Sequence, residues 1–300
     1  MRITQRAITT TSLQGLNSNL AAVNKIQQQL TSGTTISRPS DSPTGTNTSL
    51  LTRRDMAGVD QQARNITDGV TVLNSTDSTL QDMLDQVLVV RNLTLQALNQ
   101  GTMSAESQQA IAAQVSGLRE SLLGAANTVV QGRPLFGGVT TGRAAYASDG
   151  TYTGLGGSGG IPVVPVNRRI SDVESVRVDI TGAEAFGDPV AGKDLFAVVA
   201  NIVANVGDVA ALRSDLADLD VVRGKMLTAT ADIGTRQARF DTAKEVNTNR
   251  SLILQAQLSA NEDVDMPRTI MELQMQQTGY QAALQATAQV IQPTLLDFLR

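Results

Sequence analysis

The side chains most often used for chemistry are largely missing from this chain. Its 300 residues include no His and no Cys. The chain therefore cannot supply a Cys/His nucleophile pair, a Ser-His-Asp triad or a zinc site of the usual kind. Carboxylates remain, but no Asp or Glu pair stands out in the sequence as general acid and base. We predict no catalytic residue, no cofactor and no metal, and hence no enzyme.

Two short stretches could still suggest ligand binding. Residues 154–160 are glycine-rich, but they lack the Gly-Lys-Ser/Thr ending of a phosphate loop and follow no strong strand. Residues 261–265 are acidic, but they lack the alternating oxygen ligands and distal Glu of a calcium loop. We interpret the first as a flexible turn. We interpret the second as a helix start, with Asp265 as the N-cap and Pro267 in the first turn.

Charge and hydropathy argue against some classes of binding partner. The formal net charge is −4, which argues against general nucleic-acid binding. The sequence has no stretch of 18 consecutive apolar residues, so we predict no membrane insertion. A cleaved secretory signal is not expected either, because no apolar segment follows Arg2 and Arg6. Residues 1–40 are basic and residues 262–300 mostly acidic, which either favours pairing of the two ends or is a chance bias of solvated faces.

Proline and glycine positions outline the elements that remain. Long proline-free runs predict helices over 1–32, 44–100, 104–131 and 194–205, and from about Asp208 towards the end with a break at Met266-Pro267. Asp41 or Ser42 is expected to cap the second of these helices. About half of the glycines lie between 132 and 192, where 161–166 and 176–180 read as short strands. The fold class predicted is mainly α, a long antiparallel helical bundle with a small β-rich insert.

Apolar residues in the terminal helices recur at steps of three and four, the spacing of a coiled-coil seam. These apolar residues form a narrow seam on Ala- and Gln-rich helices. Such a seam must pack against partner helices to be buried, so we expect it to form an assembly interface. Its predicted residues are Leu13, Leu16, Leu20, Val23 and Leu30 near the start and Ile270, Leu273, Tyr280, Leu284, Ile291, Leu296 and Phe298 near the end.

Three domains are predicted from this pattern. Residues 1–43 and 262–300 would form terminal assembly helices, residues 44–138 and 190–261 a helical bundle, and residues 139–189 a small β-rich variable domain.

Short motifs near both ends resemble the flagellin superfamily, in particular its hook-filament junction members. They are Met1-Arg2-Ile3-Thr4, Leu30-Thr31-Ser32-Gly33, Arg38-Pro39-Ser40-Asp41-Ser42-Pro43, Asn65-Ile66, Ala126-Asn127, Gly132-Arg133-Pro134-Leu135-Phe136-Gly137-Gly138 and Leu295-Leu296-Asp297-Phe298-Leu299-Arg300. Ser42 stands where that family usually has a second Asp, and Pro134 where an aromatic is common. The resemblance covers roughly residues 1–138 and 194–300.

The resemblance implies a structural adaptor of the bacterial flagellum. Such a protein leaves the cell unfolded through the flagellar type III export channel, held beforehand by a cytoplasmic export chaperone. It then assembles as a homo-oligomeric ring between another hook-associated protein and flagellin, in an extracellular position. A flagellin filament subunit is the alternative within the family. A cytosolic helical signalling module is the alternative outside it, and the glycine-rich middle argues against that.

Overall fold

The computed structural model describes residues 2–99, 104–140, 142–158, 161–189 and 192–291. The chain is mainly helical, as predicted, and forms two compact units. Unit 1 comprises Met1–Gly58 with Arg250–Arg300, and unit 2 comprises Val59–Asn249. Two long helices, α2 (Pro43–Asn99) and α6 (Val209–Glu262), contribute residues to both units. The predicted three-domain boundaries stay a prediction.

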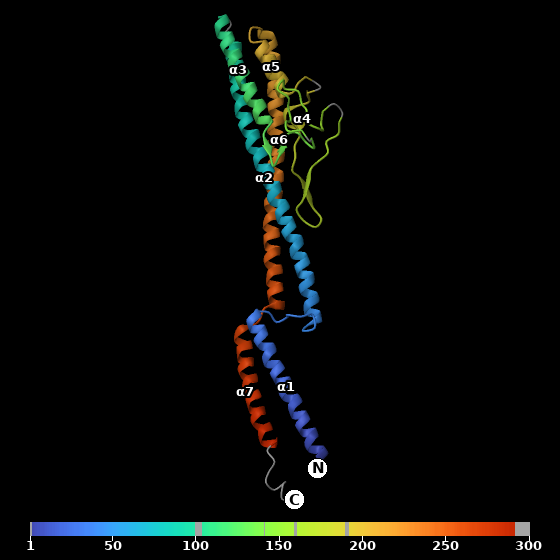
Figure 1. The fold of residues 1–300 in the computed structure, drawn as a ribbon. Coiled ribbons are helices and arrows are strands. Elements are labelled where there is room, and N and C mark those ends of the chain that lie inside the picture. Colours follow the sequence, from blue (N-terminus) through green and yellow to red (C-terminus); the bar gives the residue numbers. More distant parts are fainter. Residues whose placement is uncertain (1, 100–103, 141, 159–160, 190–191, 292–300) are drawn as a thin grey trace. The chain divides into compact units, whose positions relative to one another are not determined.

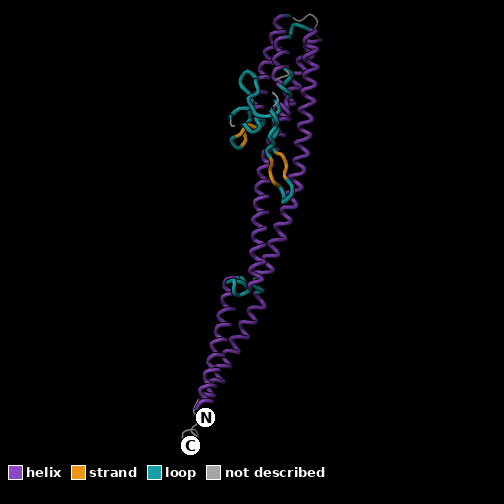
Figure 2. The backbone as a smooth tube through the Cα atoms, turned by 90° about the vertical axis from the view of Figure 1, so that its right-hand side faces the viewer, coloured by secondary structure: helices purple, strands orange, loops and turns teal. Residues whose placement is uncertain are grey.

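In unit 1 the first and last helices lie side by side and antiparallel (Figures 1 and 2). Helix α1 spans Arg2–Ser32, and Gly33 follows it with φ 72°, a left-handed conformation suited to ending a helix. Helix α7 spans Met266–Ile291, and the Asp265 carboxylate accepts a hydrogen bond from the Arg268 amide at 3.3 Å. The predicted break before Met266-Pro267 and the Asp265 cap are confirmed.

Residues 33–42, here called the strap, connect α1 to α2 and pair with the residues that precede α7. The Thr35 amide donates to the Glu262 carbonyl at 2.6 Å, and the Val264 amide donates to the Gly33 carbonyl at 3.1 Å. Thr34 and Asp263 form an antiparallel bridge. These bonds fix how far α7 extends along α1 from this end.

The strap also resolves which residue caps α2. Ser42 accepts a hydrogen bond through its hydroxyl from the Gly45 amide at 3.1 Å, so Ser42 is the cap. Asp41 instead orders the strap, because its carboxylate accepts from the Arg38 amide at 2.9 Å and pairs with Lys25 at 3.2 Å. The Lys25 ammonium and the Arg38 amide lower the pKa of Asp41.

Unit 2 holds the main core, in which α2 and α6 lie side by side with α3 (Ala105–Ala126) and α5 (Leu195–Ala204) (Figure 1). The predicted helix starts hold: the Ser104 hydroxyl caps α3, and the Asp208 carboxylate accepts from the amides of Ala210 and Ala211 at the start of α6. Fully buried side chains follow the inner faces of the long helices, namely Leu73, Leu80, Met83 and Val87 on α2 and Leu219, Met226, Ile233 and Phe240 on α6.

The insert of unit 2 contains little regular structure, all of it short. Strands β1 (Val129–Val130) and β2 (Arg133–Pro134) form one antiparallel pair, β3 (Asn167–Arg169) and β4 (Ser175–Arg177) form another, and α4 (Gly182–Phe186) follows. Four buried aromatic rings, contributed by the insert and α5, pack together: Phe136, Tyr146, Phe186 and Phe196. The insert is held to α2 through the Asn65 amide, which donates to the Arg169 carbonyl at 3.0 Å.

One strand prediction is wrong. Residues 161–166 form no strand, and the strand on this side begins only at Asn167. Pro162 and Pro165 have no amide hydrogen for a ladder, so no regular strand forms here, although the Val166 carbonyl accepts a hydrogen bond from the Val178 amide at 2.9 Å. The second predicted strand, 176–180, is partly confirmed, because β4 covers Ser175–Arg177.

Candidate assembly interface

Helix α1 carries two apolar stripes where the sequence suggested one. The half-buried or buried stripe steps by four and three residues, and we call it the α1 seam: Ser12, Leu16, Asn19, Val23, Ile26 and Leu30. Leu13 and Leu20 lie outside this seam and are 52% and 41% exposed. Three of the predicted residues, Leu16, Val23 and Leu30, therefore face α7, while two do not.

Helix α7 repeats the same arrangement. Its half-buried or buried stripe, the α7 seam, comprises Thr269, Leu273, Gln276, Tyr280, Ala283 and Thr287. Of the predicted interface residues, Leu273 and Tyr280 belong to this seam. Ile270 and Leu284 are 43% and 42% exposed and lie outside it.

The four exposed residues form one surface, which we call the flank stripe: Leu13, Leu20, Ile270 and Leu284. Each comes one residue after a seam residue, which rotates it by about 100° around its helix. The one-residue step from seam to stripe runs towards the C-terminus in both helices. Because α1 and α7 are antiparallel, this step places the two halves of the stripe on the same side of the helix pair. The flank stripe thus lies on one side of the pair, where α1 and α7 leave these four side chains partly exposed.

The predicted interface residues are therefore divided between the two seams and the flank stripe, and their role in assembly stays a prediction. Ile26 lies in the α1 seam, whereas its neighbour Gln27 is exposed. The position of Ile291 in α7 is described but its side chain is not, and Leu296 and Phe298 lie outside the described residues.

A polar pair inside the seam was missed by the sequence reasoning. The Gln276 side-chain amide donates to the Asn19 side-chain oxygen across the helix pair at 3.4 Å, and both residues are part-buried. In a sequence, an Asn or Gln side chain on a Gln-rich helix cannot be told apart from the exposed polar residues around it. Only the alternation of four and three steps through Asn19, from Leu16 to Val23, could have placed this residue in the seam.

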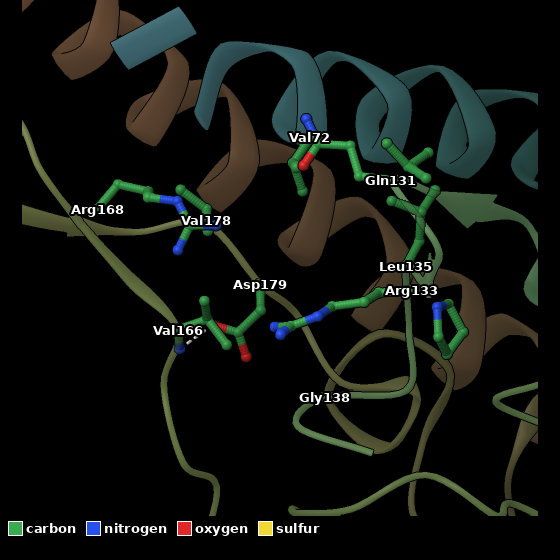
Figure 3. Close-up of a pocket in the computed structure, with 11 residues that line it drawn as sticks. Val72, Gln131, Arg133, Leu135, Gly138, Val166, Arg168, Val178 and Asp179 are labelled. Carbon is green, nitrogen blue, oxygen red and sulfur yellow. Dashed lines mark hydrogen bonds between the residues drawn. The ribbon is translucent and has the colours of Figure 1, made fainter. Parts of the chain in front are cut away.

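A cavity with charged lining lies in unit 2, between the β1–β2 hairpin, α2 and the insert (Figure 3). Its volume is about 340 Å³. Its lining residues are Val72, Val130, Gln131, Arg133, Pro134, Leu135, Gly138, Val166, Arg168, Val178 and Asp179.

The charged groups around this cavity mostly serve the fold. The Asp179 carboxylate accepts from the Val166 amide at 2.7 Å and from the Arg177 guanidinium at 3.0 Å. Arg168 pairs with Asp68 at 2.6 Å. Burial works to raise the pKa of Asp68, but hydrogen bonds from Arg168 and Gln131 together with the charge of Arg168 outweigh it, so that pKa is lowered. Among the lining residues, then, the one carboxylate is engaged in holding the insert together.

The other candidate stretches behave as elements of the fold. Residues 154–158 of the glycine-rich run form a loop, with Gly156 and Gly157 at positive φ. No cluster of acidic side chains in the described part of the chain could hold a metal ion. None of the described helices carries an apolar segment of the length and composition that crosses a membrane.

Comparison with known families assigns both flanks of the chain. Residues 3–141 match the bacterial flagellin N-terminal helical region, and residues 216–299 match the bacterial flagellin C-terminal helical region. Flagellar hook-associated protein 3 of Escherichia coli K12 is 24% identical over 95% of this chain and 96% of its own length. Flagellin of Bacillus subtilis 168 is 26% identical over the full length of both chains.

Solved structures agree with this assignment. Bacillus cereus FlgL is 25% identical, with a TM-score of 0.59 over 70% of this chain and 99% of that one. The fold is also that of a hook-associated protein from Vibrio parahaemolyticus described as putative, with a TM-score of 0.67 over 74% of this chain at 18% identity. With its flanks matched by both helical regions and its length matched by hook-associated protein 3, the chain belongs to the bacterial flagellin family and is a structural protein, not an enzyme.

Proposed function

We propose that this protein is the adaptor that joins the flagellar hook, through another hook-associated protein, to the flagellin filament. The observation that carries the proposal is the near full-length likeness to hook-associated protein 3. In this role the protein acts outside the cell at the hook-filament junction. It is secreted unfolded, after a cytoplasmic export chaperone has held it.

The flank stripe supports a role in assembly. Leu13, Leu20, Ile270 and Leu284 each expose about half of an apolar side chain along one side of a helix pair. Covering them would contribute roughly 1 kcal/mol each, since full burial of such a side chain is worth about 1.5–3 kcal/mol. We propose that neighbouring copies, and the two flagellar partners at the ends of the ring, cover this side. Residues 1–43 and 262–300 would then be the terminal assembly helices, with Ile291, Leu296 and Phe298 extending the interface.

The sparse packing of unit 1 fits such a role. Helices that gain little from their own chain become fully ordered when a neighbour completes their core, which couples folding to assembly. Such segments also resist little when a chain must pass through an export channel unfolded.

The alternative is a flagellin filament subunit, and the full-length match to Bacillus subtilis flagellin favours it. A deletion strain separates the two functions. An adaptor predicts cells with normal hooks that release flagellin monomers into the medium. Sheared filaments that consist mainly of this chain would refute the adaptor role and establish the alternative.

A residue-level experiment tests the interface itself. Leu284→Asp should abolish incorporation into hook-filament structures, because a charge on the flank stripe loses burial and adds a desolvation cost. Gln289→Asp, at an exposed polar position of the same helix about 140° around it from Leu284, is the matched control and should incorporate. Labelled protein on isolated structures measures both, and normal incorporation of Leu284→Asp would remove Leu284 from the interface.

A further inference from the structure

We infer that the Asn19–Gln276 pair is a specificity determinant that sets the register of α1 against α7. Both amides lie within the seams, where every other pairing brings together apolar or small side chains. At 3.4 Å their hydrogen bond is long, so its own strength adds little. Its effect comes from what each amide would face in any other register. The inference concerns pairing within one chain and does not depend on what the pair later assembles with.

The native register follows from two observations. Asn19 lies opposite Gln276, and Thr34 lies opposite Asp263. Counting along the antiparallel helices from these two points places Val23 opposite Leu273. The same count places Leu16 opposite Tyr280 and Ser12 opposite Ala283, so each seam residue meets a seam residue.

A slip of one heptad towards the strap would be tolerated by the apolar residues. It would place Leu273 opposite Leu30 and Tyr280 opposite Val23, two pairings as apolar as the native ones. Narrow heptad seams commonly permit such alternatives, because seven-residue repeats match themselves.

The amides are what distinguish the two registers. In the slipped register Gln276 would face Ile26, and Asn19 would face Ala283. Each amide would then be partly buried without a hydrogen-bond partner, which is unfavourable. A slip in the opposite direction is disfavoured for another reason, because it carries α7 beyond the end of the α1 seam and leaves Ile26 and Leu30 uncovered.

The strap is a second, independent register determinant at one end of the pair. A test must therefore vary both. Thr35→Pro removes the amide that donates to the Glu262 carbonyl and weakens the strap. Asn19→Leu/Gln276→Leu replaces the amide pair by an apolar one. The four combinations of these changes form a double-mutant cycle.

The natural absence of cysteine allows disulfide reporters in the full chain. The pair Ser12→Cys/Ala283→Cys reports the native register, and Leu16→Cys/Thr287→Cys reports the slipped one. A disulfide requires Cα atoms within about 7 Å, so the second pair cannot close in the native register.

We expect the native reporter to close in the unmodified background and the slipped reporter to remain open. With Thr35→Pro the slipped reporter should still form little disulfide. With Thr35→Pro and Asn19→Leu/Gln276→Leu together it should form at least tenfold more. The exchanged pair Asn19→Gln/Gln276→Asn, which keeps an amide on each helix, should restore the low level.

A second measurement separates specificity from stability. Hydrogen exchange in α1 and α7 should slow in the Asn19→Leu/Gln276→Leu variant with an intact strap, because an apolar pair packs better than two amides. Equal slipped cross-linking with and without the amides would overturn the inference. So would faster exchange or loss of both cross-links in the leucine variant, since the pair would then support stability and not register.

Discussion

Unit 1 and unit 2 are both built from long helices, yet they bury very different numbers of apolar side chains. In unit 2, Leu73, Leu80, Leu219 and Ile233 are completely buried. In the described part of unit 1, the buried apolar side chains are Val23 at 7% and Leu254 at 9% exposure. Unit 1 is held instead by polar contacts, among them the Asn261 amide, which donates to the Gly45 carbonyl at 2.8 Å and to the Ser49 hydroxyl at 2.6 Å.

This difference shows how one chain separates two tasks. A buried apolar core gives stability, but it fixes its partners within the chain. A helix pair with a half-apolar seam and an exposed flank stripe is only marginally stable and leaves surface free for other chains. Hydrogen bonds contribute less net stability than apolar burial but specify geometry. Unit 2 is therefore suited to fold stably on its own, and unit 1 is suited to pack against other chains.

The largest expected effect comes from removing an aromatic ring from each unit. Phe240→Ala should lower the free energy of unfolding by about 3–5 kcal/mol, because its fully buried ring packs into the core of unit 2. Tyr280→Ala, at a half-buried position of the α7 seam, should cost at most about 2 kcal/mol. Urea unfolding followed by circular dichroism measures both. Equal losses would contradict the difference between the two units.

An intermediate effect is expected where unit 2 buries a carboxyl without a full set of partners. Asp194 is 3% exposed at the start of α5, and its Oδ2 has no hydrogen-bond partner among the described residues. Burial raises the pKa of Asp194 above its ordinary value. A carboxyl with a raised folded pKa contributes stability at low pH, and this contribution is lost as the pH rises through the folded pKa.

Asp194→Asn should therefore stabilise unit 2 at pH 7 by roughly 1 kcal/mol, because a neutral amide costs less to bury than a carboxylate. At about pH 3, below the ordinary Asp pKa of about 3.9, the gain should vanish, because Asp194 is then neutral in both states. Thermal melts of both proteins at the two pH values test this. A gain that does not change with pH would assign the effect to packing.

The smallest effect is expected on the flank stripe of the isolated chain. Leu13→Gln/Leu20→Gln should change the free energy of unfolding by less than about 0.5 kcal/mol, because both side chains are already substantially exposed. Size-exclusion chromatography alongside urea unfolding would check that the monomer is unaffected. A loss above 1 kcal/mol would mean that the stripe is part of the chain's own core.

Helix starts were predictable from the sequence because they depend on neighbouring residues alone. The helix starts predicted near Ser104 and Asp208 and the predicted Asp265 cap agree with the structure, where each of these side chains accepts a hydrogen bond from a first amide of its helix. The strand predicted around Pro162 and Pro165 is wrong, because β-branched valines favour a strand but the two missing proline amides prevent a regular ladder.

The packing of the terminal helices was only half predictable. Leucines at steps of three, four and seven fit either of two neighbouring stripes, because positions one residue apart differ by only about 100° around a helix. Leu13 and Leu16 therefore looked equivalent in the sequence. Asn19 and Gln276 could not be recognised as partners, because the register of two helices far apart in the chain depends on the strap and on their mutual packing.

The bonds of the strap also bear on the order in which the protein folds. The Thr35 hydroxyl donates to the Glu262 carbonyl across 227 positions of sequence, so closing unit 1 from an unfolded chain would mean closing a very long loop. Loop-closure entropy makes such contacts slow to form on their own. Folding of unit 2 shortens that loop, because it brings its own first and last residues together. At this point the Asn247 side-chain amide donates to the Val59 carbonyl at 3.0 Å. Unit 1 should consequently be the last part of the chain to close and the first to open.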